Sequence, residues 1–312
     1  SILLSSPRFP SSSPCFSPCL SPSLSPRASE PGSATHIHQS ILDKESENNT
    51  ELLSKTASLL IHTAKMDQKY SDEEKQNPHL YLSMGITAEN VAKKYNISRT
   101  EQQEFSLESH RKANEAQQKD KFLSEITKIG DCELDENIRP NSTMEKLNSL
   151  NLVFDQNGTV TAATSSPLTD GAAATLICEE NFAKENGLEI LGRIKSTAVE
   201  GCDPNFMGLG PIGASKKALE RANLSADKID IVELNEAFAS QSLACIKDLG
   251  IDKDKVNLDG GALALGHPLG ATGARITGKA AELLQRENKK YALSTQCIGL
   301  GMGIATVIES VN

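Results

Sequence analysis

The sequence predicts an α/β protein built around a layered sheet. Short apolar runs, such as IDIVEL at 229–234 and YALSTQ at 291–296, have the length of buried strands. Longer amphipathic segments separate these runs, as in a sheet whose helices pack on its faces. Glycine-rich segments follow several of the runs, and glycine lets a ligand approach the backbone closely at a strand end. We therefore expect the second half of the chain to form one α/β domain.

Local signals set the elements of this domain. Pro211 stands where a first helical turn would begin, and Gly187 stands where a helix would end. Between residues 188 and 312 we expect strands at 188–199, 229–234, 256–258, 291–296 and 304–309, and helices at 211–223, 236–249 and 270–285.

The segment 76–187 predicts a second, more irregular unit. Ser98 and Glu101 form a capping box for a long charged helix that runs to about Asp120. A further helix would run from Thr87, as its cap, to Tyr95. We also expect strands at 125–129 and 159–164, an alanine-rich helix at 170–186, and a short amphipathic helix within 51–66.

The first 75 residues differ in composition from the rest. Residues 1–40 hold 7 of the 13 prolines and no acidic residue before Glu30. Such a segment cannot bury a core, so we expect disorder or a non-homologous leader over residues 1–75. Two interpretations stay open, an organelle transit peptide or a leader joined to the chain in error. The compartment accordingly stays open between cytoplasm and mitochondrion.

Composition disfavours several classes of function. The net charge of −9 argues against a nucleic-acid partner, because basic side chains supply most of that affinity. No apolar run approaches the roughly 20 residues of a membrane span. The 7 cysteines lack the spacing of a zinc site, so we expect no metal site.

Three polar residues at the ends of apolar runs are candidates for a catalytic site. Asn235 follows a strand directly, where it could meet a ligand or simply cap the next helix. His267 lies in GGALALGHPLGATG, where it could act as an acid or base or be a structural histidine. Cys297 precedes a glycine turn, where it could be a thiolate base near the Gly299 N–H or an inert buried thiol.

These segments resemble the signature blocks of the thiolases, the acetyl-CoA C-acyltransferases. The resemblance implies a thiolase-like α/β/α/β/α fold, with a complete C-terminal half at 188–312, a truncated N-terminal half at 76–187 and a loop domain over the site. It is carried by SMGITAENVAKKY (83–95), RPNSTMEKL (139–147), GTVTAATSSPLTDGAAA (158–174), MGLGPIGASKKALERA (207–222), NEAFA (235–239), GGALALGHPLGATG (260–273) and CIGLGMG (297–303).

The resemblance also implies a reaction. It would be thiolysis of a 3-ketoacyl-CoA by CoA, or the reverse Claisen condensation, in fatty-acid metabolism. CoA and acyl-CoA would be substrates, and no bound cofactor is expected. Thiolases usually self-associate, so a homo-oligomer is expected on the same basis.

The family pattern implies roles for particular residues. His267 would activate a nucleophilic cysteine and, with a water held by Asn235, form an oxyanion hole. Cys297 would move the proton at the acetyl α-carbon, beside the Gly299 N–H. The residues implied in binding are Ser166 at the pantetheine and Met84 and Met207 at the acyl pocket.

Two features depart from the family pattern. Thiolases carry the nucleophile in a Cys-x-Ser-Gly segment, whereas Cys15-x-Ser and Cys19-x-Ser continue into proline and residues 1–75 hold no other cysteine. We therefore expect the 312-residue chain to lack covalent catalysis, and the alternative function is a non-catalytic CoA-binding or subunit-pairing protein. Leu300 replaces a family glycine, which predicts backbone strain if φ is positive there.

Overall fold

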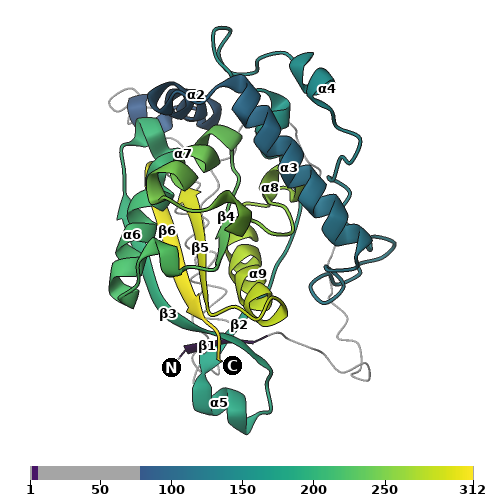
Figure 1. Ribbon diagram of the computed structural model, residues 1–312, viewed down its shortest axis with the longest axis vertical. Coiled ribbons are helices and arrows are strands. Elements are labelled where there is room, and N and C mark those ends of the chain that lie inside the picture. Colours follow the sequence, from purple (N-terminus) through teal and green to yellow (C-terminus); the bar gives the residue numbers. More distant parts are fainter. Residues whose placement is uncertain (1, 6–77, 312) are drawn as a thin grey trace, which may run out of the picture.

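A mixed sheet runs through the centre of the computed structural model, which describes residues 2–5 and 78–311 (Figure 1). In this part of the chain the strand order is β2-β1-β3-β6-β5-β4. The β4–β5 pair is parallel and the other neighbouring pairs are antiparallel. The strands are β1 (Ile2–Ser5), β2 (Leu176–Glu179), β3 (Ile190–Gly201), β4 (Ile231–Leu234), β5 (Tyr291–Ile298) and β6 (Met302–Glu309).

Helices cover both faces of this sheet (Figure 1). Alternate strand residues point to opposite faces, so Val232 and Leu293 pack with α6 (Gly210–Ala222) and α7 (Ala239–Leu249). Their sequence neighbours pack against α9 (Thr272–Arg286) on the other face. Each fully buried aliphatic side chain of this kind contributes roughly 1.5–3 kcal/mol of burial free energy. The described residues thus form three α/β/α layers of the expected fold.

A second group of helices lies across the end of the sheet where β4 and β5 finish (Figure 1). It comprises α2 (Met84–Tyr95) and α3 (Arg99–Gln118), and the chain between α3 and β2 is mostly irregular. The remaining helices are α4 (Met144–Asn148), α5 (Glu180–Glu185) and α8 (Ala262–Leu265), with short 3-10 turns at Pro78–Tyr81, Ala162–Thr164, Pro204–Leu209, Ala226–Lys228 and Lys253–Lys255.

Most predictions for the C-terminal half are confirmed within a few residues, and Asn223 ends α6 in the left-handed conformation. In the segment before it, the predicted Ser98–Glu101 capping box is present. The strand expected at 256–258 is reduced to a single parallel bridge between Val256 and Val232.

Four local predictions were wrong. Ser83, not Thr87, caps α2, and the Thr87 hydroxyl instead donates to the Met84 carbonyl inside the first turn. The segments 125–129 and 159–164 are not strands, because each finds only an isolated bridge and no extended partner. The segment 170–186 is not one helix, since 176–179 pairs with β1 and the sheet outweighs the helix propensity of its alanines.

Residues 2–5 also differ from expectation. Disorder was predicted there, but Ile2–Ser5 forms β1 and pairs with both β2 and β3. The physical reason is that this apolar run precedes the first proline, so its backbone N–H groups are free to join a ladder. The other expectations for residues 1–75, including the helix within 51–66, lie outside the described residues.

Candidate active site

The first candidate residue, Asn235, lies just beyond the end of β4. Its backbone N–H continues the sheet by donating to the Thr295 carbonyl of β5 at 3.0 Å. The α7 helix begins only at Ala239, so Asn235 is not its cap, and the capping alternative is wrong. The side chain is fully buried, and its Oδ1 has no hydrogen-bond partner in the described part of the chain. The amide is therefore available to a ligand or a water.

The second candidate residue, His267, contacts Asn235 directly. Its Nε2 lies 3.3 Å from Asn235 Nδ2, and its Nδ1 lies 2.7 Å from Thr272 Oγ1. The Thr272 hydroxyl donates its only proton to the Pro268 carbonyl at 3.0 Å, so it accepts the Nδ1–H. This arrangement leaves the Nε2 lone pair facing the Asn235 amide, where it can take up a proton from a substrate or a thiol.

The backbone around His267 is held in place by Gly266 and Thr169. Gly266 has φ of +93°, and a Cβ there would lie 2.4 Å from Thr169 Oγ1. That Thr169 hydroxyl accepts the His267 backbone N–H at 3.2 Å. The glycine before His267 is therefore required both for its φ and for close packing, as the glycine-rich sequence indicated.

The third candidate residue, Cys297, lies in β5, next to the strand that leads into Asn235. It packs in one apolar cluster with Met207, Ala237 and Phe238. Burial raises the pKa of its thiol to about 12. At neutral pH the free thiol thus remains protonated, and its capacity as a base increases with pH.

The expected binding residues lie around the same cluster. The Ser166 backbone N–H donates to the Ala237 carbonyl at 3.0 Å, and Met207 is buried within the cluster. Met84 begins α2, whose Ala88 belongs to the cluster. Gly299 lies in the turn after β5, where a Cβ would meet no atom within 4 Å. These contacts therefore bring Ser166 and Met207 to the cluster that contains Cys297, at the carboxyl ends of β4 and β5. In the described part of the chain, Met84, which is 38% exposed, and Gly299 lie on neighbouring segments without a hydrogen-bond contact to the three candidates.

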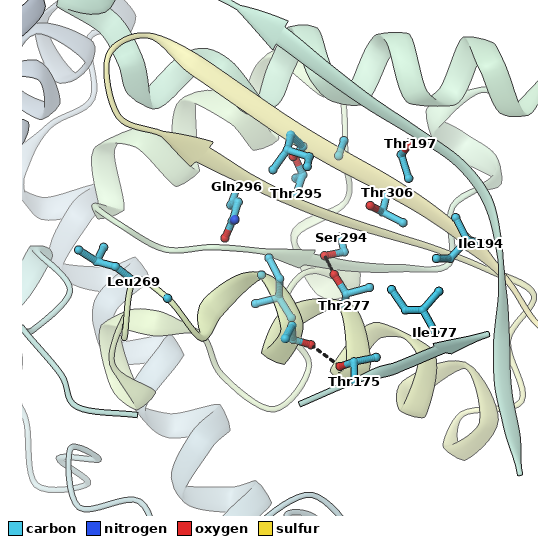
Figure 2. Close-up of a pocket in the computed structure, with 16 residues that line it drawn as sticks. Thr175, Ile177, Ile194, Thr197, Leu269, Thr277, Ser294, Thr295, Gln296 and Thr306 are labelled. Carbon is cyan, nitrogen blue, oxygen red and sulfur yellow. Dashed lines mark hydrogen bonds between the residues drawn. The ribbon is translucent and has the colours of Figure 1, made fainter. Parts of the chain in front are cut away.

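A cavity of about 250 Å³ adjoins this region on the α9 face of the sheet (Figure 2). It extends from Leu269, two residues after His267, to Ile194 and Thr306 on the sheet. Its lining combines hydroxyl and aliphatic side chains with the amide of Gln296 and contains no charged group. Such a lining suits an uncharged part of a ligand better than an ionic group. Two hydrogen bonds join residues that line the cavity (Figure 2). One links the hydroxyls of Thr277 and Ser294, and in the other the Thr175 hydroxyl donates to the Ala274 carbonyl.

Sequence reasoning did not find Thr169 or Thr272. Their only signal was two hydroxyl side chains near glycine-rich segments, and hydroxyls there usually cap helices.

Among the described residues no group of His, Cys, Asp and Glu could hold a metal ion. No helix in 78–311 is both long and apolar enough to cross a membrane.

The turn after Cys297 contains the backbone strain predicted at Leu300. Its φ is +65°, and every other non-glycine residue with positive φ in the described chain is Asn or Asp. Left-handed backbone costs an L-residue such as leucine roughly 1–2 kcal/mol, and glycine avoids this cost. The Leu300 side chain is 52% exposed, so its removal forfeits little burial.

Replacing Leu300 by glycine should therefore stabilise the protein. We expect Leu300→Gly to raise the free energy of unfolding by up to about 1 kcal/mol in urea denaturation, after the entropic cost of glycine is subtracted. Leu168, which is 99% exposed and does not have positive φ, provides a matched control. Leu168→Gly should be neutral or slightly destabilising, and an equal gain at both positions would contradict the strain at Leu300.

Comparison with known proteins identifies the family of this chain. The family model for "Thiolase, C-terminal domain" matches residues 188–310, and that for "Thiolase, N-terminal domain" matches residues 45–181. The chain belongs to the thiolase family. The N-terminal match begins within the segment that sequence analysis assigned to a leader, and the C-terminal match begins where the C-terminal domain was expected.

Individual thiolases are similar over most of this chain. A 3-ketoacyl-CoA thiolase of Vibrio parahaemolyticus is 52% identical over 239 residues, covering 72% of this chain and 61% of the relative. One of Idiomarina loihiensis is 53% identical over 242 residues, covering 73% and 62%. The crystal structure of human mitochondrial 3-ketoacyl-CoA thiolase has a TM-score of 0.73 at 42% identity and covers 75% of this chain and 61% of the human chain. The chain thus spans about three fifths of the length of these thiolases.

Proposed function

We propose that this thiolase-family chain binds acyl-CoA and activates its α-carbon, the chemistry of 3-ketoacyl-CoA thiolysis and of the reverse Claisen condensation. The observation that carries the proposal is the contact between Asn235 Nδ2 and His267 Nε2, next to the strand that bears Cys297. The similarity to a human mitochondrial 3-ketoacyl-CoA thiolase solved in complex with CoA, at 43% identity, supports CoA as the ligand.

The proposed chemistry begins with proton transfer at the thioester. The Cys297 thiolate takes a proton from the methyl group of acetyl-CoA and becomes a thiol, and the electron pair moves onto the thioester oxygen. Asn235 Nδ2–H can donate to that oxygen, and His267 is a second donor when Nε2 has taken up a proton from solvent. The Asn235 donor is fixed before the reaction and therefore stabilises the enolate without having to reorganise.

Acyl transfer needs a further thiol. In thiolysis that thiol attacks the 3-keto carbon, and the bond to the α-carbon breaks to leave the acetyl-CoA enolate, which takes a proton from the Cys297 thiol. The thiol of CoA then attacks the acyl group and releases it as acyl-CoA. Residues 1–75 contain no Cys-x-Ser-Gly segment to supply it. We therefore propose that the 312-residue chain performs the proton-transfer step and not the complete thiolysis.

Deuterium exchange tests this proposal. Acetyl-CoA is incubated with the chain in D₂O, and loss of the methyl proton signal is followed by NMR. We expect exchange above the protein-free rate, lost in Asn235→Ala and retained in Cys132→Ala, since Cys132 is exposed and distant in sequence from the site. Cleavage of acetoacetyl-CoA by CoA should remain at background.

Other outcomes would decide against parts of the proposal. Acetyl-CoA binding without exchange would contradict the catalytic role and favour the alternative, a CoA-binding or subunit-pairing protein. Thiolysis above background would show that a thiol elsewhere in the chain acts as the nucleophile.

We also propose self-association, supported by the exposed apolar residues Leu176 and Ile177 on β2, and analytical ultracentrifugation tests it.

A further inference from the structure

A buried carboxylate follows the catalytic candidate Asn235 directly in the chain. Glu236 is 2% exposed and accepts hydrogen bonds at both of its oxygens. Oε2 accepts from Ser109 Oγ at 2.7 Å and from the Leu263 backbone N–H at 3.1 Å. Oε1 accepts from Asn257 Nδ2 at 2.7 Å. Ser109 belongs to α3 and Leu263 to α8. Asn257 follows Val256, the residue that forms a bridge with β4.

These hydrogen bonds form a network around the end of β4. The Asn257 side chain also holds the last residue of β4, since it accepts from the Leu234 N–H and donates to the Leu234 carbonyl, both at 2.9 Å. Ser109 Oγ accepts the Gly261 N–H at 3.0 Å while donating to Glu236. One carboxylate thus connects the strand that leads into Asn235 with the α8 segment that leads into His267.

Glycine at position 261 allows this approach. A Cβ there would lie 2.2 Å from the Glu236 carboxyl carbon, which real Cβ atoms do not tolerate. The loop is therefore packed directly onto the carboxylate. Displacement of Glu236 would be transmitted to α8 and on to His267, four residues after Leu263.

The network consists of neutral donors around one acid. Within the described residues Glu236 has no ion-pair partner, and burial raises its pKa despite the three hydrogen bonds. A buried carboxylate without a direct ion pair is costly, and the charge of Lys112 offsets only part of this cost, so the surrounding fold must supply hydrogen-bond donors. The geometry of these donors makes the position of Glu236 strongly determined.

We propose that Glu236 is a positioning residue, which sets the placement of Asn235 relative to His267. Its effect on catalysis rests on the proposed function, whereas its effect on the Asn235–His267 contact does not. Two readouts separate these claims. The ¹⁵N chemical shift of His267 Nε2 reports its hydrogen bond with Asn235, and methyl exchange of acetyl-CoA reports the chemistry.

The test compares two carboxylates of similar burial. Glu236→Gln keeps the volume but replaces one acceptor by an NH₂ group that faces donors. Glu89 is the matched control, because it is 8% exposed and accepts from the Thr159 and Val160 N–H groups, and it takes no part in the Ser109–Asn257–Leu263 network. We expect Glu236→Gln to shift the Nε2 resonance and lower methyl exchange about 10- to 100-fold, and Glu89→Gln to leave both near the parent values.

The outcomes remain interpretable if one variant is unstable. Ser109→Ala removes one donor without adding a polar group, and it should shift the Nε2 resonance in the same direction as Glu236→Gln. An unchanged Nε2 resonance in a folded Glu236→Gln or Ser109→Ala protein would overturn the proposal. Absence of exchange in the parent, together with a shifted resonance in both variants, would contradict the proposed function but support the positioning role.

Discussion

Replacing Cys297 by alanine is expected to lower the rate of acetyl-CoA methyl exchange at least about 100-fold, because the variant loses the base that we propose takes the α-proton. Acetyl-CoA binding should be nearly unchanged, since Cys297 Sγ contributes only a small part of the apolar cluster. The exchange rate is measured by NMR, and binding is measured by calorimetry under the same conditions.

The pH dependence of exchange follows from the same thiol. Burial raises the Cys297 pKa to about 12, so the thiolate fraction of the free protein rises about tenfold per pH unit below that value. The parent's second-order rate should therefore climb from pH 7 to pH 9, and the rate of Cys297→Ala should follow the protein-free rate. Cys245, another fully buried thiol, is the matched control, and Cys245→Ala should keep the parent's pH profile. A flat profile in the parent would contradict the role of Cys297 as the base.

Replacing Gly303 by alanine is expected to destabilise the fold by at least about 3 kcal/mol, because β6 and the start of α6 approach backbone to backbone there. A Cβ on Gly303 would lie 2.1 Å from the Gly210 carbonyl carbon, and a Cβ on Gly210 would lie 2.2 Å from the Met302 carbonyl oxygen. Neither backbone can yield as a flexible side chain would, since Gly303 also pairs with Glu200 and Cys297 in the sheet. Urea denaturation measures the loss.

Gly270 provides the control for that prediction. A Cβ there meets no atom within 4 Å, and its φ is not positive, so Gly270→Ala should change the free energy of unfolding by less than about 0.5 kcal/mol. Similar stabilities for Gly303→Ala and Gly270→Ala would show that α6 can shift away from β6. Such a result would refute the close backbone packing.

Several elements were predictable from sequence because they depend on local signals. The Ser98–Glu101 box and the Asn223 end of α6 are set by neighbouring residues, and the buried strand 231–234 is apolar except for Glu233. The segments 125–129 and 170–186 were mispredicted because tertiary partners decide them. Residues 176–179 became a strand because β1 pairs with them, and no local pattern reveals that partner.

The site shows the same division between local and long-range information. Asn235, His267 and Cys297 could be selected because each stands at the end of an apolar run or in a glycine-rich turn. Glu236 could not be selected as a positioning residue, because its donors lie 127 residues upstream and 21 and 27 residues downstream. Thr272 was missed for a related reason, since its partner depends on how the Gly266 turn directs the imidazole ring.

The central claim is that Asn235 and His267 bind the thioester oxygen while Cys297 faces the α-carbon. A crystal structure of the chain with acetyl-CoA tests it most directly. We predict that the thioester oxygen lies within hydrogen-bond distance, about 2.7–3.2 Å, of Asn235 Nδ2 or His267 Nε2, with the methyl carbon against Cys297 Sγ. Acetyl-CoA bound with its thioester away from these three side chains would contradict the claim.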